Sequence, residues 1–83
     1  LFREIPKQAA VSASNHLLLH LQYRDKLKLF PDYRGAEYVI FEEVAAPDPP
    51  YTRAANNLAN DSAYQLVKSE NGIVLYKKLI VIP

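Results

Sequence analysis

The spacing of apolar and polar residues divides this chain into short strands and helices. An apolar run at residues 9–13 contains a β-branched valine and suits a buried strand. Three leucines then recur at a spacing that puts them on one face of a helix predicted over residues 16–23: Leu17, Leu18 and Leu21. The chain is therefore expected to open with a strand that leads into a short helix.

Strand signals dominate the next part of the chain. Residues 26–30 alternate polar and apolar side chains, which is the period of a half-buried strand. Four strand-forming residues follow one another at 38–41, which predicts a strand that is buried on both faces. Between these two segments, Arg34-Gly35 predicts a turn.

A proline cluster separates this part from a second predicted helix. Residues 45–50 include three prolines, which cannot lie inside a helix or a central strand, so this segment is expected to be a connector. Residues 51–60 then show apolar positions at helical spacing. Three asparagines in this stretch lower its intrinsic helix propensity.

The chain ends in a predicted hairpin, which completes an α/β fold. Strands are expected at residues 64–67 and 73–82, joined around Asn71-Gly72, because a type I′ turn needs positive φ at both of its central positions. The order β-α-β-β-α-β-β favours a small mixed five-stranded sheet that ends in an antiparallel hairpin. Ten apolar residues are expected to form most of the core: Val11, Leu17, Leu21, Leu29, Val39, Phe41, Leu58, Leu66, Val74 and Leu75.

Composition narrows the classes of function. A length of 83 residues predicts one domain over residues 1–83, and the absence of cysteine excludes disulfides and thiolate metal sites. A net charge of +1 gives no basis for nucleic-acid binding, and no apolar run is long enough for this chain to insert into a bilayer. The chain begins at Leu1 and contains no methionine, so we expect a piece of a longer protein.

The polar turn after the first strand is the candidate ligand site. Ser12, Ser14 and Asn15 lie where a parallel strand ends and a helix begins, which is where α/β sheets bind ligands and where the helix dipole favours an anion. His20 and Arg24 complete the set of candidate ligand-binding residues. The alternative is structural: Ser14 or Asn15 caps the helix, and Arg24 interacts with its C-terminal dipole.

A metal site and a catalytic triad are two further candidates at the same helix. His16 and His20 have the spacing of a two-histidine metal pair, but a metal needs a third ligand and no glutamate lies between them. Ser14, His20 and Asp25 lack the Gly-x-Ser-x-Gly turn of a hydrolase, and the first two lie on one short helix. We therefore predict no metal, no cofactor and no catalytic residue in this chain.

Several motifs of the chain are similar to one family of membrane proteins. The most specific are Ser12-Ala13-Ser14-Asn15, His20-Leu21-x-x-Arg24 and Phe30-Pro31, and the ending around Gly72-Ile73-Val74 is also similar. The family comprises predicted polytopic membrane proteins of bacteria and archaea, of unknown function, whose membrane core resembles the GT-C glycosyltransferases. In it, the corresponding segment is a soluble C-terminal tail that follows the last membrane helices.

The resemblance implies an extracytoplasmic domain at the cell membrane whose partner is the membrane-embedded core of the same polypeptide. The acidic catalytic residue of GT-C enzymes lies in a loop between membrane helices, so no residue of this chain inherits a catalytic role. The first functional hypothesis is therefore a non-catalytic accessory domain of a glycosyltransferase-like membrane protein. The alternative is an independent module that binds a small anion at the turn formed by residues 12–15.

Overall fold

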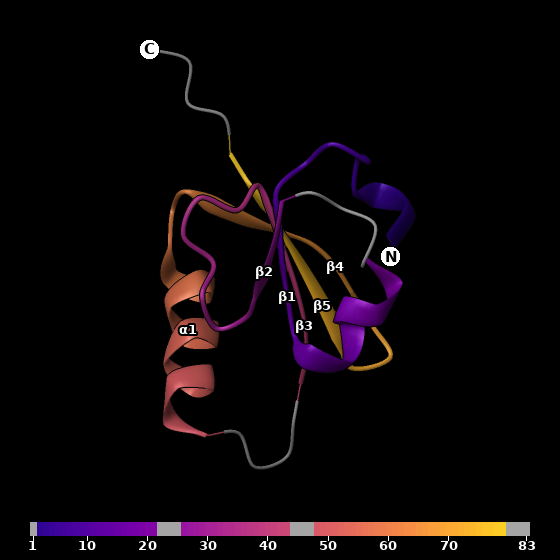
Figure 1. Cartoon of the computed structure of the whole chain (residues 1–83). Coiled ribbons are helices and arrows are strands. Elements are labelled where there is room, and N and C mark those ends of the chain that lie inside the picture. The colour runs from indigo at the N-terminus through magenta and orange to yellow at the C-terminus, as the bar shows by residue number, and fades with distance from the viewer. Residues whose placement is uncertain (1, 22–25, 44–47, 80–83) are drawn as a thin grey trace.

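A five-stranded sheet lies at the centre of the fold (Figure 1), in a computed structural model that describes residues 2–21, 26–43 and 48–79. The strands are β1 (Val11–Ala13), β2 (Leu27–Leu29), β3 (Tyr38–Glu42), β4 (Tyr64–Glu70) and β5 (Ile73–Lys78). The helical elements are two 3₁₀ helices, η1 (Phe2–Glu4) and η2 (Asn15–His20), and the α-helix α1 (Pro49–Asn60).

The strand order is β2-β1-β3-β5-β4, which combines parallel and antiparallel pairs. β1 pairs in parallel with both β2 and β3, whereas β5 pairs antiparallel with β3 and with β4. β3 and β4 therefore run in the same direction, joined by α1, and β5 lies between them. This confirms the predicted mixed five-stranded sheet with a closing antiparallel hairpin.

The hairpin turn between β4 and β5 has the backbone geometry that its sequence predicts. Asn71 has a φ of 52° and Gly72 has a φ of 78°. Positive φ at both positions is the requirement of a type I′ turn, and asparagine and glycine are the residues that meet it at least cost. The turn therefore fixes the register of the two longest strands of the sheet.

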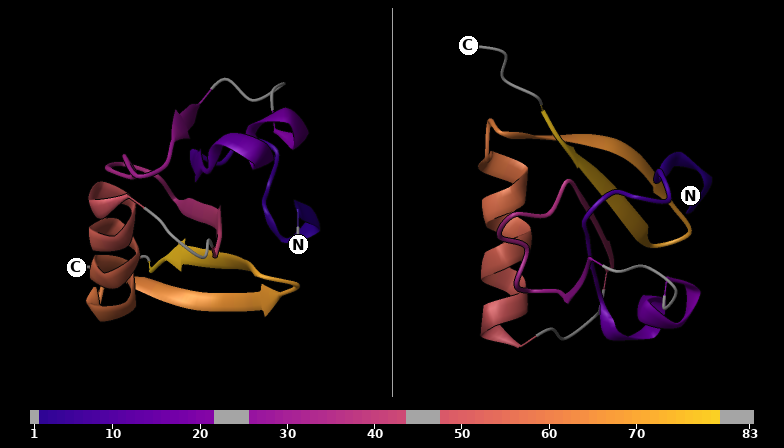
Figure 2. Two further views of the ribbon diagram at one scale, coloured as in Figure 1. Left: turned by 90° about the horizontal axis from the view of Figure 1, so that it is seen from below. Right: turned by 45° about the horizontal axis from the view of Figure 1, so that its top comes forward.

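The two faces of the sheet bury two separate cores. α1 covers one face, while η1 and η2 lie on the other (Figure 2). Because side chains alternate along a strand, Val39 and Phe41 of β3 contact the core beneath α1, and Ile40 contacts the core beneath η2. All three side chains are buried, so the prediction that this strand is buried on both faces is confirmed.

A layer of aromatic rings fills the core on the α1 side. Phe30, which follows β2, stacks on Phe41 with a centroid distance of 4.5 Å, and Phe41 stacks in turn with Tyr76 of β5 at 6.2 Å. The ring of Tyr51 in α1 is nearly perpendicular to the ring of Phe30, and the two ring centroids are 4.9 Å apart. Each such pair contributes roughly 0.5–1.5 kcal/mol beyond its area burial, so this layer holds the helix against the sheet.

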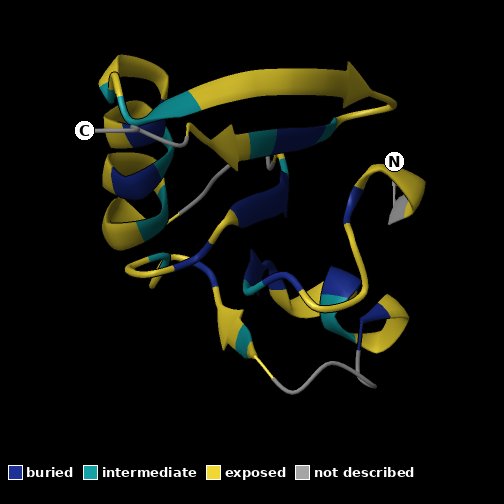
Figure 3. Cartoon of the chain, turned by 90° about the horizontal axis from the view of Figure 1, so that it is seen from above, coloured by how far each residue is buried: buried dark blue, intermediate teal, exposed yellow. Residues whose placement is uncertain are grey.

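Two of the predicted core residues are wrong, and both lie on edge strands. Leu29 of β2 is 52% exposed and Leu66 of β4 is 51% exposed. Each strand has a neighbour on one side only, and Figure 3 shows β4 exposed over most of its length. The buried anchor next to β2 is Phe30 instead, which the alternating pattern did not distinguish from the leucines around it.

The helix boundaries also differ from the prediction. The first helix is a six-residue 3₁₀ helix that ends at His20, and residues 22–25 lie outside the described part of the chain. The proline connector is shorter than expected because Pro49 and Pro50 are the first two residues of α1. Proline is well suited to that position, since the first N–H groups of a helix have no partner within the helix.

The corrected core predicts how two leucine substitutions will differ. Leu58→Ala should lower the free energy of unfolding by about 2–5 kcal/mol, because Leu58 is 1% exposed and its removal leaves a cavity under α1. Leu66→Ala makes the same chemical change at a half-exposed position and should cost about 1 kcal/mol or less. Urea unfolding of both variants measures the difference, and equal losses would contradict the assignment of Leu66 to the surface.

Candidate functional site

The hydroxyl of Ser12 has an internal partner. Ser12 is fully buried at the middle of β1, where it pairs in register with Lys28 on one side and Val39 on the other. Its hydroxyl donates a hydrogen bond of 2.7 Å to the backbone carbonyl of Asp32. Asp32 belongs to the crossover loop, residues 30–37, that connects β2 to β3. Ser12 therefore ties this loop to the centre of the sheet.

The side chain of Ser14, the residue that follows β1, also has a partner within the protein. Its side chain is buried, and its hydroxyl oxygen accepts a hydrogen bond of 3.4 Å from the backbone N–H of Glu42. The hydroxyl of Tyr51 donates to the carbonyl of the same residue, Glu42, at 2.5 Å. The prediction that Ser14 or Asn15 caps the helix is met in position only: Ser14 is the N-cap residue of η2, but its side chain makes no capping hydrogen bond.

The other predicted site residues that the structure describes lie on η2, which begins directly after Ser14. Asn15, His16 and His20 are exposed on η2, and His16 Nδ1 lies 3.5 Å from the Glu42 carboxylate. A 3₁₀ helix has three residues per turn, so positions four apart differ by about 120° in direction and the α-helical basis of the histidine pair does not apply. Arg24 lies outside the described residues.

No group of three or more histidine, aspartate, glutamate or cysteine side chains in residues 2–21, 26–43 and 48–79 is arranged so that it could hold a metal ion. The strand-end turn that the sequence singled out thus connects Ser14 and Tyr51 through hydrogen bonds to Glu42. Ser12 is bound separately, to Asp32.

Tyrosine hydroxyls bind backbone carbonyls on the α1 side of the sheet, a role that sequence analysis missed. The Tyr64 hydroxyl lies 2.7 Å from the carbonyl oxygen of Ala36, at the end of the crossover loop. Burial raises the pKa of Tyr64, Tyr51 and Tyr33 above the ordinary tyrosine value. No local pattern could have revealed these bonds, because Tyr64 and Ala36 are 28 positions apart in the chain.

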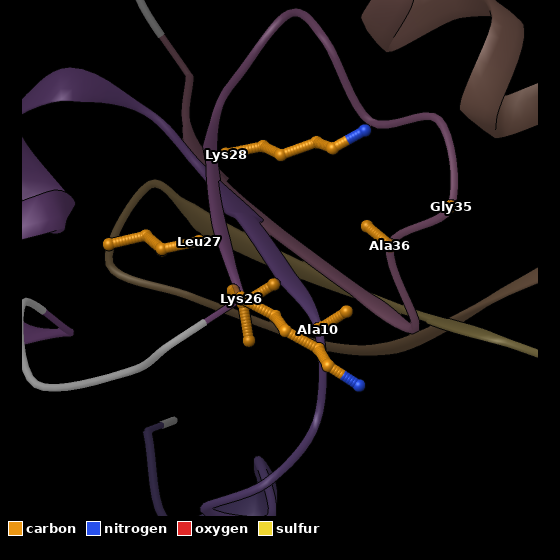
Figure 4. Close-up of a pocket in the computed structure, with 7 residues that line it drawn as sticks. Ala10, Lys26, Leu27, Lys28, Gly35 and Ala36 are labelled. Atoms are coloured by element: carbon orange, nitrogen blue, oxygen red, sulfur yellow. The ribbon is translucent and has the colours of Figure 1, made fainter.

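A pocket of about 290 Å³ lies at the opposite, amino-terminal end of β1 and β2 (Figure 4). Its lining includes the apolar residues Ala10, Leu27 and Ala36. Two lysines, Lys26 and Lys28, also line it. Lys28 Nζ donates a hydrogen bond of 2.6 Å to the carbonyl of Arg34. Lys28 therefore connects β2 to the crossover loop and adds to the bond made by Ser12.

Comparisons with known proteins found no matching family model, no matching curated protein and no matching solved structure. In the described part of the chain, no helix has the length and apolar character needed to cross a membrane. The resemblance to a membrane-protein family therefore stays a prediction, and the function must be inferred from the residues of this chain.

The bond from Ser12 to the crossover loop predicts a stability effect. Ser12→Ala should lower the free energy of unfolding by about 1–3 kcal/mol, because it leaves the Asp32 carbonyl without its donor in a partly buried position. Ser69→Ala on β4 is the matched control, since this serine is exposed and its loss should change stability by about 0.5 kcal/mol or less. Equal effects of the two substitutions in urea unfolding would show that the Ser12 bond is not important.

The raised tyrosine pKa values predict an alkaline loss of stability. A raised pKa means that the folded protein holds the phenolic proton more tightly than the unfolded chain does. The contribution of these tyrosines to the free energy of unfolding is therefore fully present below about pH 10, the ordinary tyrosine pKa. This contribution is lost as the pH rises above that value. A Tyr51→Phe, Tyr64→Phe double variant should show a flatter decline above this pH in thermal unfolding. An unchanged slope would argue against buried phenols as its cause.

Proposed function

We propose that this chain is a non-catalytic accessory domain on the extracytoplasmic side of a polytopic, glycosyltransferase-like membrane protein. Its partner is the membrane-embedded core of the same polypeptide. The motifs around Ser12–Asn15 and Phe30-Pro31 support the family relationship by resemblance. The role of the domain is to support that core or to contact its partners.

The observation that carries this proposal is the closed strand-end turn. In α/β sheets, the carboxyl ends of parallel strands are where ligands and reacting groups usually gather. Here the buried Ser12 hydroxyl donates to the carbonyl of Asp32, and the buried Ser14 hydroxyl accepts from the N–H of Glu42. The Tyr51 hydroxyl donates to the carbonyl of Glu42. In other α/β proteins, polar groups at this position bind a ligand. In this chain they form hydrogen bonds within the domain, which supports an accessory role.

The alternative is an independent module that binds a small anion at residues 12–15. Asn15 is exposed and can face such a ligand, but Ser12 donates its one hydroxyl proton to Asp32 and would have to break that bond to donate to an anion. Breaking a buried hydrogen bond without replacement costs about 1–3 kcal/mol, which would be subtracted from the binding energy. The geometry therefore favours the accessory domain.

Fractionation of the source cells tests the accessory-domain proposal. An antibody raised against this 83-residue chain should recognise a much larger protein that stays with the membranes after an alkaline wash. A peripheral protein is released by that wash, whereas a polytopic protein is not, since its spans remain buried in the bilayer. A small reactive band in the soluble fraction would overturn the proposal and favour an independent module.

A second readout tests the side of the membrane. Protease added to intact spheroplasts should remove the epitope if the domain lies on the extracytoplasmic side, and a cytoplasmic marker protein should survive the same treatment. An epitope that is lost only after the spheroplasts are lysed would contradict the proposed location, even if the protein remained in the membrane fraction.

A further inference from the structure

A second hollow lies on the α1 side of the molecule, between the helix and the crossover loop. It has a volume of about 570 Å³. On the helix, Pro50, Arg53 and Asn57 line it, at a spacing that puts them on one face of α1. On the loop, Pro31 and residues 32–34 form the facing wall. We refer to this hollow as the α1–loop groove.

The charges in the α1–loop groove leave one positive group unbalanced. Arg34 Nε lies 3.4 Å from the carboxylate of Asp32, and the backbone N–H of Arg34 donates to the same oxygen at 3.4 Å. These contacts with Arg34 hold the pKa of Asp32 below its ordinary value, so Arg34 and Asp32 offset each other at neutral pH. The Arg53 side chain is exposed and makes no hydrogen bond or ion pair with the residues that the structure describes.

The α1–loop groove also has apolar lining residues, and one of them, Tyr33, is held in place by its aromatic neighbours. The ring of Tyr33 stacks with Phe30 at 6.4 Å and meets Tyr64 edge-on at 5.5 Å, so the aromatic core fixes it. Pro31 and Pro50 carry no backbone N–H and present flat apolar rings. A ligand with a short apolar surface could therefore pack here without leaving a backbone donor of either proline unpaired.

The shape and the polar groups of the groove fit an extended peptide better than a single small anion. Residues 50–57 cover about 10 Å of helix, the length of about three residues of extended chain. The Asn57 side chain offers one carbonyl acceptor and two N–H donors, which match the N–H and C=O of a peptide group. The Arg53 guanidinium matches the planar, two-oxygen form of a carboxylate.

We propose that the α1–loop groove binds an extended acidic segment of a partner protein. A carboxylate of that segment pairs with Arg53, its backbone bonds to Asn57, and its side chains pack against Pro31 and Pro50. This proposal goes beyond the accessory-domain role and is independent of it, because a peptide site can be measured on the chain alone.

An NMR titration of the ¹⁵N-labelled chain tests the proposal directly. A blocked tetraglutamate peptide should cause saturable amide shifts that are concentrated in residues 31–34 and 50–57. A blocked tetraglutamine peptide of the same length should not, because it lacks the carboxylates. Inorganic phosphate distinguishes an acidic peptide from any anion: saturation by phosphate but not by tetraglutamate would overturn the proposal, and so would equal shifts from the two peptides.

Arginine variants locate the binding charge. Arg53→Gln should weaken tetraglutamate binding about 1.5- to fivefold, the range of an exposed charge pair. Arg34→Gln should weaken it at least as much, because Asp32 would then repel the peptide without an offsetting charge. Arg3→Gln is the matched control, since it removes the same charge from η1 on the other face of the sheet and should leave binding unchanged. An equal loss in all three variants would show general charge attraction and overturn the site.

Discussion

The position of the crossover loop depends on the hydrogen bond between the Ser12 hydroxyl and the Asp32 carbonyl. The crossover loop must pass from β2 to β3 over the buried strand β1, and a buried hydroxyl and a partly buried carbonyl each need a partner. One bond satisfies both. With the loop held there, Phe30 enters the aromatic layer beneath α1. The position of the loop therefore determines the core on this face and one wall of the α1–loop groove.

α1 depends on this arrangement as much as the loop does. Its three asparagines lower its intrinsic helix propensity, and a twelve-residue helix is marginal in water in any case. Tyr51 stabilises the helix against the sheet, because its ring packs on Phe30 and its hydroxyl donates a hydrogen bond to the carbonyl of Glu42. Loop, helix and sheet are thus connected through the same few aromatic side chains, and a change in one should be felt in the others.

The features that the sequence predicts well are those that local residues decide. Local sequence determines the strand at residues 38–41, where four strand-forming residues follow one another, and the turn at Asn71-Gly72. Both are found as predicted. Burial of a given leucine is different, because it depends on where its strand lies in the sheet. Leu29 and Leu66 have the pattern of core residues, but strand order places β2 and β4 at the edges. No pattern within either strand contains that information.

The same reasoning explains the outcome at the candidate site. A serine at the end of a strand looks alike in sequence whether it faces a ligand or a backbone carbonyl, and the partners of Ser12 and Ser14 lie 20 and 28 positions away. Arg34 and Arg53, by contrast, share no motif and become neighbours only because the loop and α1 cover the same face of the sheet. In a domain this small, buried polar groups are needed to complete the fold. The recognition proposed for the α1–loop groove therefore depends on exposed side chains that the topology brings together, and Arg53 is the clearest of these.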